Sequence, residues 1–377
     1  MRRTSLLVGA RALLGAAVLS TGSLNFLNTS VSSASTGASG FSSPDAIAVS
    51  ASDVWVANVI GNSVAEFNVA SGSLVRVINA KADGFHRPEG IAVNGSHVWV
   101  TNSNQDLDAM GTARYPLATY SSITELNANN GSLVRVINRP ADHLVEPGPI
   151  AICGSHVWVV NDNATANAVS SAAVTLVELN DSNGSLVRLY RANVDGLDGL
   201  INLTATRSDV WLTNLYGPYD SKSSVTELNA RTGSLVRIVK AQKKDPPDPV
   251  SVDGSHVWIG TTLMGSNSVT ELNARTGSLV RIIKAKADHF NGLSGIAAQG
   301  SHVWVTNSGA LASRGNTNSV TELNARTGSL VRIIKAKADG FNRPSDVVAS
   351  GSKLWVLNFD SITELNQNNG SLVRVIR

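Results

Sequence analysis

The 377-residue chain has little cysteine, few aromatic side chains and a small net charge. Cys153 is the sole cysteine, so an intramolecular disulfide and a four-cysteine metal site are both excluded, and we expect a small buried strand residue. The formal charge is only +3, and lysines such as Lys240, Lys284 and Lys335 are spread along the chain. This balance argues against a dedicated nucleic-acid surface.

Long apolar runs and helical periodicity are also scarce. No segment after residue 40 keeps a 3.6-residue apolar period, so helices are not expected there. The apolar run Ala12–Leu19 is too short to span a bilayer comfortably, and no later segment is apolar enough. We therefore expect no membrane insertion.

Instead, one sequence pattern recurs seven times along the chain. Each copy reads roughly Gly-Ser-His-Val-Trp-Val-Thr-Asn, then Val-Thr-Glu-Leu-Asn, then Gly-Ser-Leu-Val-Arg-Val-Ile. A single tryptophan falls in each copy, at Trp55, Trp99, Trp158, Trp211, Trp258, Trp304 and Trp355. A repeat of about 50 residues is typical of solenoids and propellers, in which each unit buries its apolar face against its neighbours.

Every copy holds four short segments rich in Val, Ile, Thr and Trp, bounded by Gly, Asn, Ser and Pro. In the second copy the first two are Ile91–Val93 and His97–Thr101, joined by the tight turn Asn94-Gly95. Four strands in each of seven copies predict an all-β seven-bladed β-propeller of four-stranded antiparallel blades. Copy 1 begins at strand one near Pro44 and copy 7 ends on strand four. The ring should therefore close by packing between copies 1 and 7.

Strand two of the second copy ends in Trp99-Val100-Thr101-Asn102. This motif, an aromatic residue followed by an apolar residue, a threonine and a polar residue, is shared with a known family. Over residues 41–377 the repeat resembles the YVTN/NHL-type propellers, in particular the virginiamycin B lyase-like family. The resemblance implies that strand one lines the channel and strand four lies outermost. The two-to-three and four-to-one connections would then share one face. The lyase residues do not carry over, because the strand-two Glu is here Asn or Thr and no His follows the proline.

The N-terminus predicts export. Arg2-Arg3, the apolar run that ends at Leu19 and the small residues Ser32-Ser33-Ala34 are typical of a signal peptide, although Arg11 interrupts the apolar stretch. We expect a signal peptide over 1–34, a linker over 35–43 and the propeller over 44–377. The mature chain should be a monomer in the periplasm, outside the cell or on the surface of a bacterium.

Most recurring polar residues are expected to serve the architecture. The Glu and Arg of each copy lie ten residues apart, as in Glu227 and Arg237, and should face each other across the third-to-fourth hairpin. Four histidines, His97, His156, His256 and His302, fall at the first-to-second turns of separate blades. They are expected to be solvated turn residues rather than a metal cluster.

Length variation singles out the connection after each tryptophan strand. From Trp to the Arg of the same copy the distance runs from 19 to 36 residues, with long connections in copies 2, 3 and 4. Insertions in repeat proteins map to one face, often the binding face. Our first hypothesis is thus an exported binding or scaffold propeller that recognises a ligand, glycan or protein through this rim. Its candidate residues are Asn102, Asp106, Asp108, Arg114, Tyr115, Tyr120, Asn161, Tyr216, Tyr219 and Asp220.

The alternative is a metal-assisted lyase or hydrolase at the mouth of the channel. Asp residues seven positions after the strand-four Arg, together with carboxylates after the proline of strand one, could form a collar for a divalent cation. Asp residues at such turns more often cap their own loop. The candidates are Asp45, Asp83, His86, Glu89, Asp142, His143, Asp248, Asp288, His289 and Asp339. No catalytic residue is assigned, and no cofactor other than this cation is expected.

Overall fold

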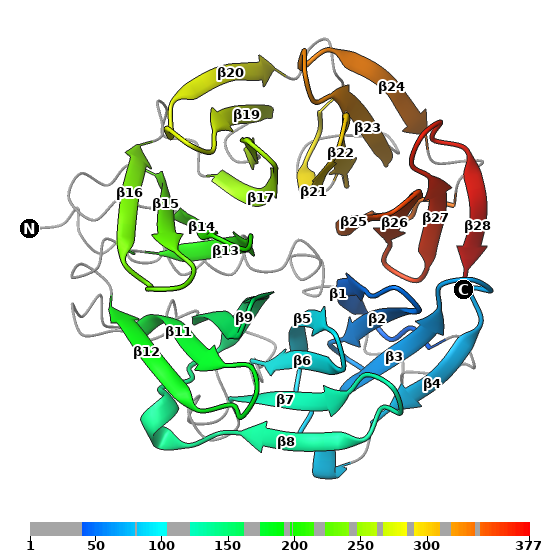
Figure 1. Cartoon of the computed structure of the whole chain (residues 1–377). Coiled ribbons are helices and arrows are strands. Elements are labelled where there is room, and N and C mark those ends of the chain that lie inside the picture. Colours follow the sequence, from blue (N-terminus) through cyan, green and yellow to red (C-terminus); the bar gives the residue numbers. More distant parts are fainter. Residues whose placement is uncertain are drawn as a thin grey trace, which may run out of the picture.

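The computed structural model describes residues 40–79, 81–103, 121–161, 174–191, 197, 199–214, 223–240, 247–261, 267–284, 290–309, 318–335 and 340–377. Within these residues 28 strands form seven antiparallel four-stranded sheets. Figure 1 shows the sheets arranged as blades around a central axis. The predicted all-β seven-bladed propeller is confirmed.

Strands one and two form the inner half of each blade. Strand one is β1 (Pro44–Val49), β5 (Pro88–Asn94), β9 (Pro147–Cys153), β13 (Leu200–Ala205), β17 (Pro247–Asp253), β21 (Leu293–Gln299) and β25 (Asp346–Ser350). Strand two is β2 (Asp53–Asn58), β6 (His97–Asn102), β10 (His156–Asn161), β14 (Asp209–Asn214), β18 (His256–Thr261), β22 (His302–Asn307) and β26 (Lys353–Leu357). Strand one lines the channel, as the resemblance implied (Figure 1).

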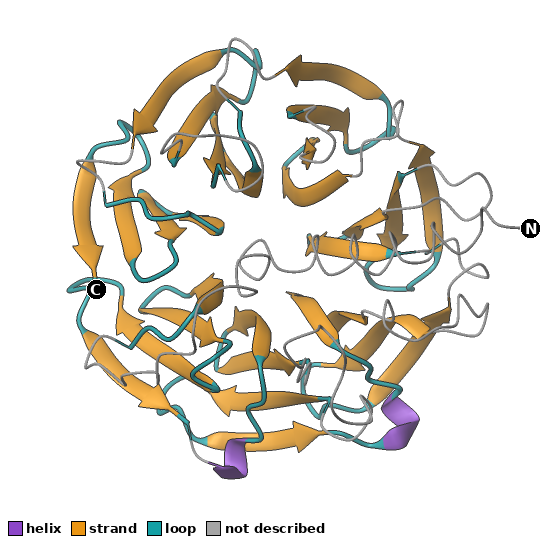
Figure 2. Ribbon diagram, turned by 180° about the vertical axis from the view of Figure 1, so that it is seen from behind, coloured by secondary structure: helices purple, strands orange, loops and turns teal. Residues whose placement is uncertain are grey.

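Strands three and four form the outer half. Strand three is β3 (Ser63–Asn68), β7 (Ser122–Asn127), β11 (Val174–Asn180), β15 (Ser224–Asn229), β19 (Ser268–Asn273), β23 (Ser319–Asn324) and β27 (Ile362–Asn366). Strand four is β4 (Leu74–Ile78), β8 (Leu133–Ile137), β12 (Leu186–Arg191), β16 (Leu235–Lys240), β20 (Leu279–Lys284), β24 (Leu330–Lys335) and β28 (Leu372–Ile376). Two short 3-10 helices, η2 (Lys81–Asp83) and η4 (Pro140–Asp142), lie at the outer edge (Figure 2). No helix in the described part of the chain is long and apolar enough to cross a membrane.

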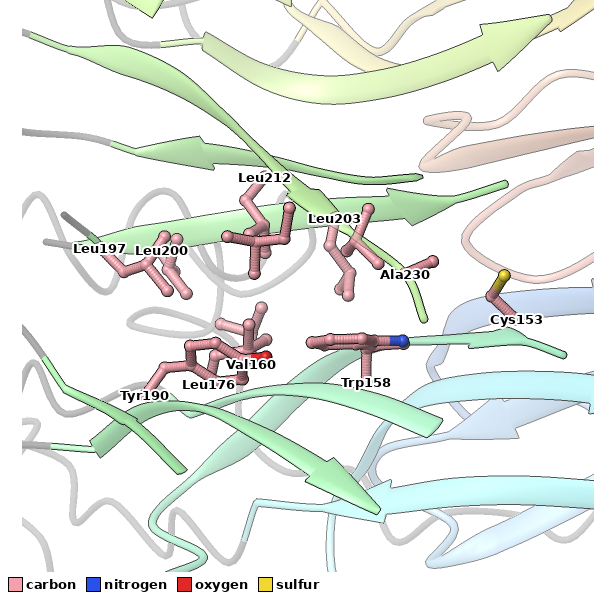
Figure 3. Close-up of a cluster of buried hydrophobic side chains, with 12 residues drawn as sticks. Cys153, Trp158, Val160, Leu176, Tyr190, Leu197, Leu200, Leu203, Leu212 and Ala230 are labelled. Atoms are coloured by element: carbon pink, nitrogen blue, oxygen red, sulfur yellow. The ribbon is translucent and has the colours of Figure 1, made fainter. Parts of the chain in front are cut away.

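The core consists of layers between neighbouring blades. All seven tryptophans are fully buried. Trp158 of blade 3, for example, packs with Leu203, Leu212 and Ala230 of blade 4 (Figure 3). Each large ring therefore fills the space between its own sheet and the next, which confirms the predicted packing role. Cys153 belongs to the same layer, as expected of a buried strand residue.

Blades 1 and 7 close the ring without exchanging a strand. Each of the two sheets is built from four consecutive strands, β1–β4 and β25–β28. Trp355 packs among residues of blade 1, including Val54 and Phe67. Lys353 Nζ donates to Val69 O at 2.6 Å, and Arg374 donates to Ala70 O at 2.8 Å. Closure thus uses the same side-chain packing and turn contacts that join other blades.

The strand-four arginines link each blade to the next. Arg135 of blade 2 donates to Ser182 O of blade 3 at 3.3 Å, and Arg281 of blade 5 donates to Arg326 O of blade 6 at 3.0 Å. The receiving turn contains a glycine with positive φ, and at Gly277 a Cβ would lie 2.6 Å from Arg237 Cδ. Glycine is therefore required there both by backbone conformation and by the close approach of the arginine.

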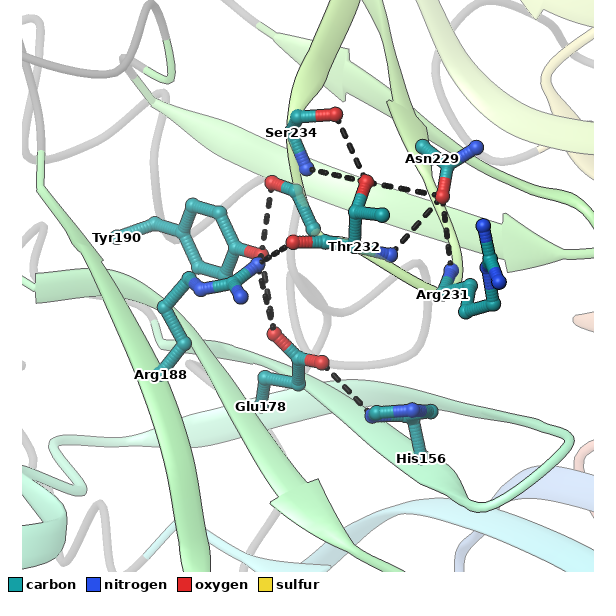
Figure 4. A network of polar contacts seen from close by, with 9 residues as sticks. His156, Glu178, Arg188, Tyr190, Asn229, Arg231, Thr232 and Ser234 are labelled. Atoms are coloured by element: carbon teal, nitrogen blue, oxygen red, sulfur yellow. Dashed lines mark hydrogen bonds and ion pairs between the residues drawn. The ribbon is translucent and has the colours of Figure 1, made fainter.

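The strand-three glutamate is the polar centre of each blade. Glu125 lies opposite Arg135 in the register, and their Oε2 and Nε atoms are 2.8 Å apart. The predicted cross-strand pairing is confirmed in all seven blades by the register. In blade 3 Tyr190 also joins, and its hydroxyl lies 3.0 Å from Glu178 Oε2 (Figure 4).

The four histidines that were predicted to be solvated turn residues are 19–37 % exposed, but each also has a carboxylate partner, which the prediction did not include. His97, His156, His256 and His302 begin strand two, and each Nδ1 lies 2.6 or 2.7 Å from the glutamate of its own blade. The histidine lies two residues before the Trp and therefore on the same face of strand two, and the Trp is opposite the strand-three glutamate, so the imidazole ring reaches the buried carboxylate. Lys353 replaces it in blade 7, and Asp53 and Asp209 stand there in blades 1 and 4.

Candidate functional site

At the mouth of the channel the blades differ from one another in sequence. The residue before the Pro or Leu that opens the strand-one segment has a left-handed backbone in every blade where it is described. It is a non-glycine in blades 7, 1, 2 and 3 and a glycine in blades 4 and 6. The residues and their φ values are Arg343 (50°), Ser43 (56°), Arg87 (50°), Glu146 (47°), Gly199 (62°) and Gly292 (62°). L-residues other than glycine are strained there, and such outliers gather at functional sites.

A second departure from the repeat adds carboxylates to the same mouth. Asp45, Glu89 and Asp346 come from strand one, or its entry, in the neighbouring blades 1, 2 and 7, and all are half-buried. In blades 1 and 2 the ladder shifts register between the proline and the residue two positions on, so Asp45 and Glu89 occupy a bulge. Bulges re-aim side chains beside functional sites. Asp248 stands at the corresponding position of blade 5, away from this group.

Burial favours the protonated form of these acids, and repulsion from neighbouring carboxylates adds to this effect at Asp45. Burial raises the pKa of Asp45 to about 8, with Glu89 and Asp346 adding to the shift and Arg87 opposing it. Burial raises the pKa of Glu89 against Arg87 and Ser103, and raises that of Asp346 to about 7 against two backbone N–H donors. The pKa of Asp248 also rises to about 7 by burial. Asp45 and Asp346 at this mouth, and Asp248 in blade 5, therefore exchange protons near neutral pH.

Arg87 connects this mouth to the long connection of blade 2. Its guanidinium lies 3.7 Å from Glu89 Oε1, and its backbone N–H donates to Asn62 Oδ1 at 2.7 Å. Ser103 donates its hydroxyl to Glu89 Oε1 at 2.7 Å. Since Ser103 directly precedes the connection of residues 104–120, the base of that connection and the mouth carboxylate form one hydrogen-bonded unit.

Asn102 and Asn161 lie inside their blades. The Asn102 side chain is fully buried, and its amide group donates to Ser122 Oγ and Thr124 Oγ1 at 3.1 Å. Asn161 is 2 % exposed and donates to His143 O at 2.7 Å. The Oδ1 atoms accept backbone N–H groups 16 residues upstream, as they do at Asn58, Asn307 and Asn358. These amides fix the incoming loop to strand two, and a ligand contact by them stays a prediction.

The structure places Asp83 and Asp142 away from the predicted collar. Both end short 3-10 helices at the outer edge of the ring, and Thr124 Oγ1 donates to Asp83 O at 2.6 Å (Figure 2). Asp142 is buried and pairs with Arg139 at 2.8 Å. The four-to-one connection starts from the outermost strand of one blade and leads to strand one of the next blade at the channel. Its first half therefore lies far from the mouth, which is why the expected collar position is wrong for these two residues.

The two described histidines of these connections lie near the loop amides. His86 is half-buried, and its backbone N–H donates to Asn102 Oδ1 at 3.4 Å. His143 is exposed with a left-handed backbone and caps η4. Among the described residues no group of three or more His, Cys, Asp or Glu side chains could hold a metal ion. The carboxylates at the mouth thus do not assemble a complete cation site by themselves.

The remaining predicted residues lie outside the described part of the chain. They are Asp106, Asp108, Arg114, Tyr115, Tyr120, Tyr216, Tyr219 and Asp220 of the rim, and Asp288, His289 and Asp339 of the four-to-one connections.

Sequence reasoning missed Arg87, Ser103 and Asp346. Arg87 could have been found as a bulky residue before a proline, where an extended backbone is expected. Asp346 was passed over because counting from Pro344 selects Ser345 as the equivalent of Asp45 and Glu89. In the structure β25 begins at Asp346, one residue after Ser345.

Comparisons with known proteins support the fold. No protein-family model matches the chain, and no curated protein matches its sequence. Among solved structures, the chain resembles Kuenenia stuttgartiensis hydrazine synthase with a TM-score of 0.61 and 14% identity over 86% of this chain and 95% of that one. It also resembles the computationally designed Ika8 protein, with a TM-score of 0.53 and 11% identity over 89% and 96% of the two chains. BamB from Moraxella catarrhalis aligns with a TM-score of 0.51 and 15% identity over 86% and 96%. At these identities the likeness shows the β-propeller fold alone.

Proposed function

We propose that this protein is an exported binding or scaffold propeller that recognises a ligand or partner on the face formed by the long connections of blades 2, 3 and 4. The working residues would be the Tyr, Arg and Asp side chains of those connections, with the charged mouth of blades 7, 1 and 2 beside them. A propeller fold is compatible with such a role, and BamB from Moraxella catarrhalis resembles this chain in fold.

One observation supports this proposal above others. The recurring polar residues are used inside the blades, whereas non-glycine residues stand at strained left-handed positions on four consecutive blades of the mouth. Each such position costs roughly 1–3 kcal/mol. Glycine avoids this cost, and blades 4 and 6 carry it at the same position, as Gly199 and Gly292. The backbone cost at Arg87, next to the connection of blade 2, is explained if that side chain serves recognition.

The test is binding of the purified mature protein to glycan and small-molecule arrays. Shortening the connection between Asn104 and Ser121 should abolish the strongest signal with little change in melting temperature. The matched control shortens residues 310–317, the long connection of blade 6 on the other side of the ring. Equal loss in both variants, or no loss in either, would contradict the assignment of the rim to blades 2–4.

A metal-assisted lyase or hydrolase at the mouth is the second candidate. It is favoured by the neighbouring carboxyl groups of Asp45 and Glu89, whose pKa values are both raised by burial, since carboxyl groups that exchange protons near neutral pH can serve as general acid or base. The resemblance to the virginiamycin B lyase-like family points the same way. A thermal shift with Mg²⁺ or Ca²⁺ that Asp45→Asn and Glu89→Gln remove, together with ligand turnover, would favour this candidate over pure binding.

Export is part of the proposal and has its own test. N-terminal sequencing of secreted material should begin near residue 35, and the mature chain should elute as a monomer. Recovery of the intact Met1 form from the cytosol alone would contradict export.

A further inference from the structure

The outer wall of blades 4, 5 and 6 differs from that of the other blades in charge. The three strand-four hairpins have the sequence Asn-Ala-Arg-Thr-Gly-Ser-Leu-Val-Arg-Ile-Ile-Lys, with Val in place of one Ile in blade 4. They cover residues 229–240, 273–284 and 324–335. Each contains three cations and no acidic residue. Figure 1 shows the outer strands β16, β20 and β24 following one another along the circumference.

Two of the three cations in each hairpin face solvent. The exposed residues are Arg231, Arg275 and Arg326 at the turns, and Lys240, Lys284 and Lys335 at the strand ends. The middle arginines are held by glutamates, with Nε–Oε2 distances of 2.5 to 2.7 Å. The turn arginines have no ion pair with any residue that the structure describes. At the turn position blades 1, 2, 3 and 7 carry Ala70, Asn129, Ser182 and Asn368.

Exposed aliphatic side chains accompany these arginines. A register shift at the start of strand four turns both members of a Leu-Val pair outward. Leu235 is 50 % exposed, Val236 43 %, Leu279 40 %, Val280 43 %, Leu330 37 % and Val331 43 %. The same pair recurs in the other blades, but among the seven strand-four hairpins, which the structure describes, only those of blades 4, 5 and 6 also carry an exposed arginine at the turn.

We propose that this wall docks the protein, side-on, to a bilayer containing anionic lipid. Arginine and lysine neutralise anionic headgroups, while the leucines and valines enter the interfacial region, and this combination is the chemistry of a peripheral membrane surface. An acidic polysaccharide would match the cations but would leave the aliphatic pairs unused. The contact is peripheral and goes beyond ligand recognition, since it leaves the channel mouth free at right angles to the bilayer.

Vesicle sedimentation tests the proposal directly. The mature protein should bind vesicles of phosphatidylcholine mixed with phosphatidylglycerol, fail to bind phosphatidylcholine alone, and dissociate with added NaCl. Each cation near an anionic leaflet contributes about fivefold to partitioning, so Arg231→Asn, Arg275→Asn and Arg326→Asn together should weaken binding by about 100-fold. Asparagine is what blades 2 and 7 carry at this position, so the triple variant should melt like the wild type.

Two further variants separate the bilayer from other occupants. Adding Ala70→Arg, Asn129→Arg and Asn368→Arg to the triple variant moves the cations to blades 1, 2 and 7, and should restore part of the vesicle binding. Leu235→Asn, Leu279→Asn and Leu330→Asn together should weaken vesicle binding with all cations retained. The proposal is overturned if the wild type ignores anionic vesicles, if the arginine triple variant binds them normally, or if a soluble acidic polysaccharide is bound instead.

Discussion

The two sides of the ring depart from the repeat in different places. Blades 7, 1, 2 and 3 vary at the channel mouth, where Arg343, Arg87 and Glu146 replace the glycines that blades 4 and 6 use. Blades 4, 5 and 6 keep nearly identical outer hairpins, and their distinguishing charges lie on the outside. Both sides share the same Trp layers and Glu–Arg pairs. The architecture thus tolerates two independent surfaces, because neither change touches the packing between blades.

The shared packing predicts that the two sides are equally sensitive in the core. We expect Trp99→Ala and Trp304→Ala each to lower the free energy of unfolding by about 3–5 kcal/mol, since each opens a large cavity between blades. Denaturant titration of both variants measures this. If one of the two variants lost less than about 1 kcal/mol of unfolding free energy, the tryptophan layers on the two sides would not contribute equally to stability.

A smaller effect distinguishes the junction between blades 2 and 3. Trp99 Nε1 donates to Asp181 Oδ1 at 2.9 Å, whereas Trp158 and Trp304 have no such partner among the described residues. Asp181→Ala should cost about 1.5–3 kcal/mol, the range for hydrogen bonds to charged groups. Asp181→Asn keeps an acceptor and should recover about half of that loss. Equal losses in the two variants would mean that the indole bond contributes little.

The fold could be predicted from the sequence because the same blade pattern occurs seven times. One tryptophan and one Glu–Arg spacing in each copy specify the blade number and the third-to-fourth hairpin. The pairing of the histidines with glutamates could not be predicted from the sequence, since only the strand register shows that the first residue of strand two reaches the strand-three carboxylate. The residues at the channel mouth could be predicted from the sequence only in part. Asp45 and Glu89 follow prolines visibly, but Arg87 becomes notable only through its left-handed backbone.

Exchanging residues at that backbone position sharpens the comparison of the two sides. Gly292→Arg should cost about 1–2 kcal/mol, the penalty for a left-handed L-residue. Arg87→Gly should gain less than about 1 kcal/mol, because glycine relieves the strain but loses more chain entropy on folding. Melting temperatures of both variants report the sign. The strain argument fails if Arg87→Gly destabilises the protein while array binding is retained.

The smallest effect concerns pH and the mouth of blades 7, 1 and 2. Because the pKa of Asp45 is raised in the folded state to about 8 from 3.8, folding takes up protons. Its contribution to stability is present in full below pH 4 and is lost as pH rises toward 8. Solvent screening of a half-buried group limits the change, so we expect the melting temperature to fall by about one or two degrees across this window. Asp45→Asn should make the fall shallower without abolishing it, since Asp346 and Asp248 also have raised pKa values of about 7, whereas Asp360→Asn, at an exposed carboxylate, should leave it unchanged. A profile that rises from pH 5 to pH 8 in the wild type and is unaffected by Asp45→Asn would show that Asp45 is ionised in the folded protein.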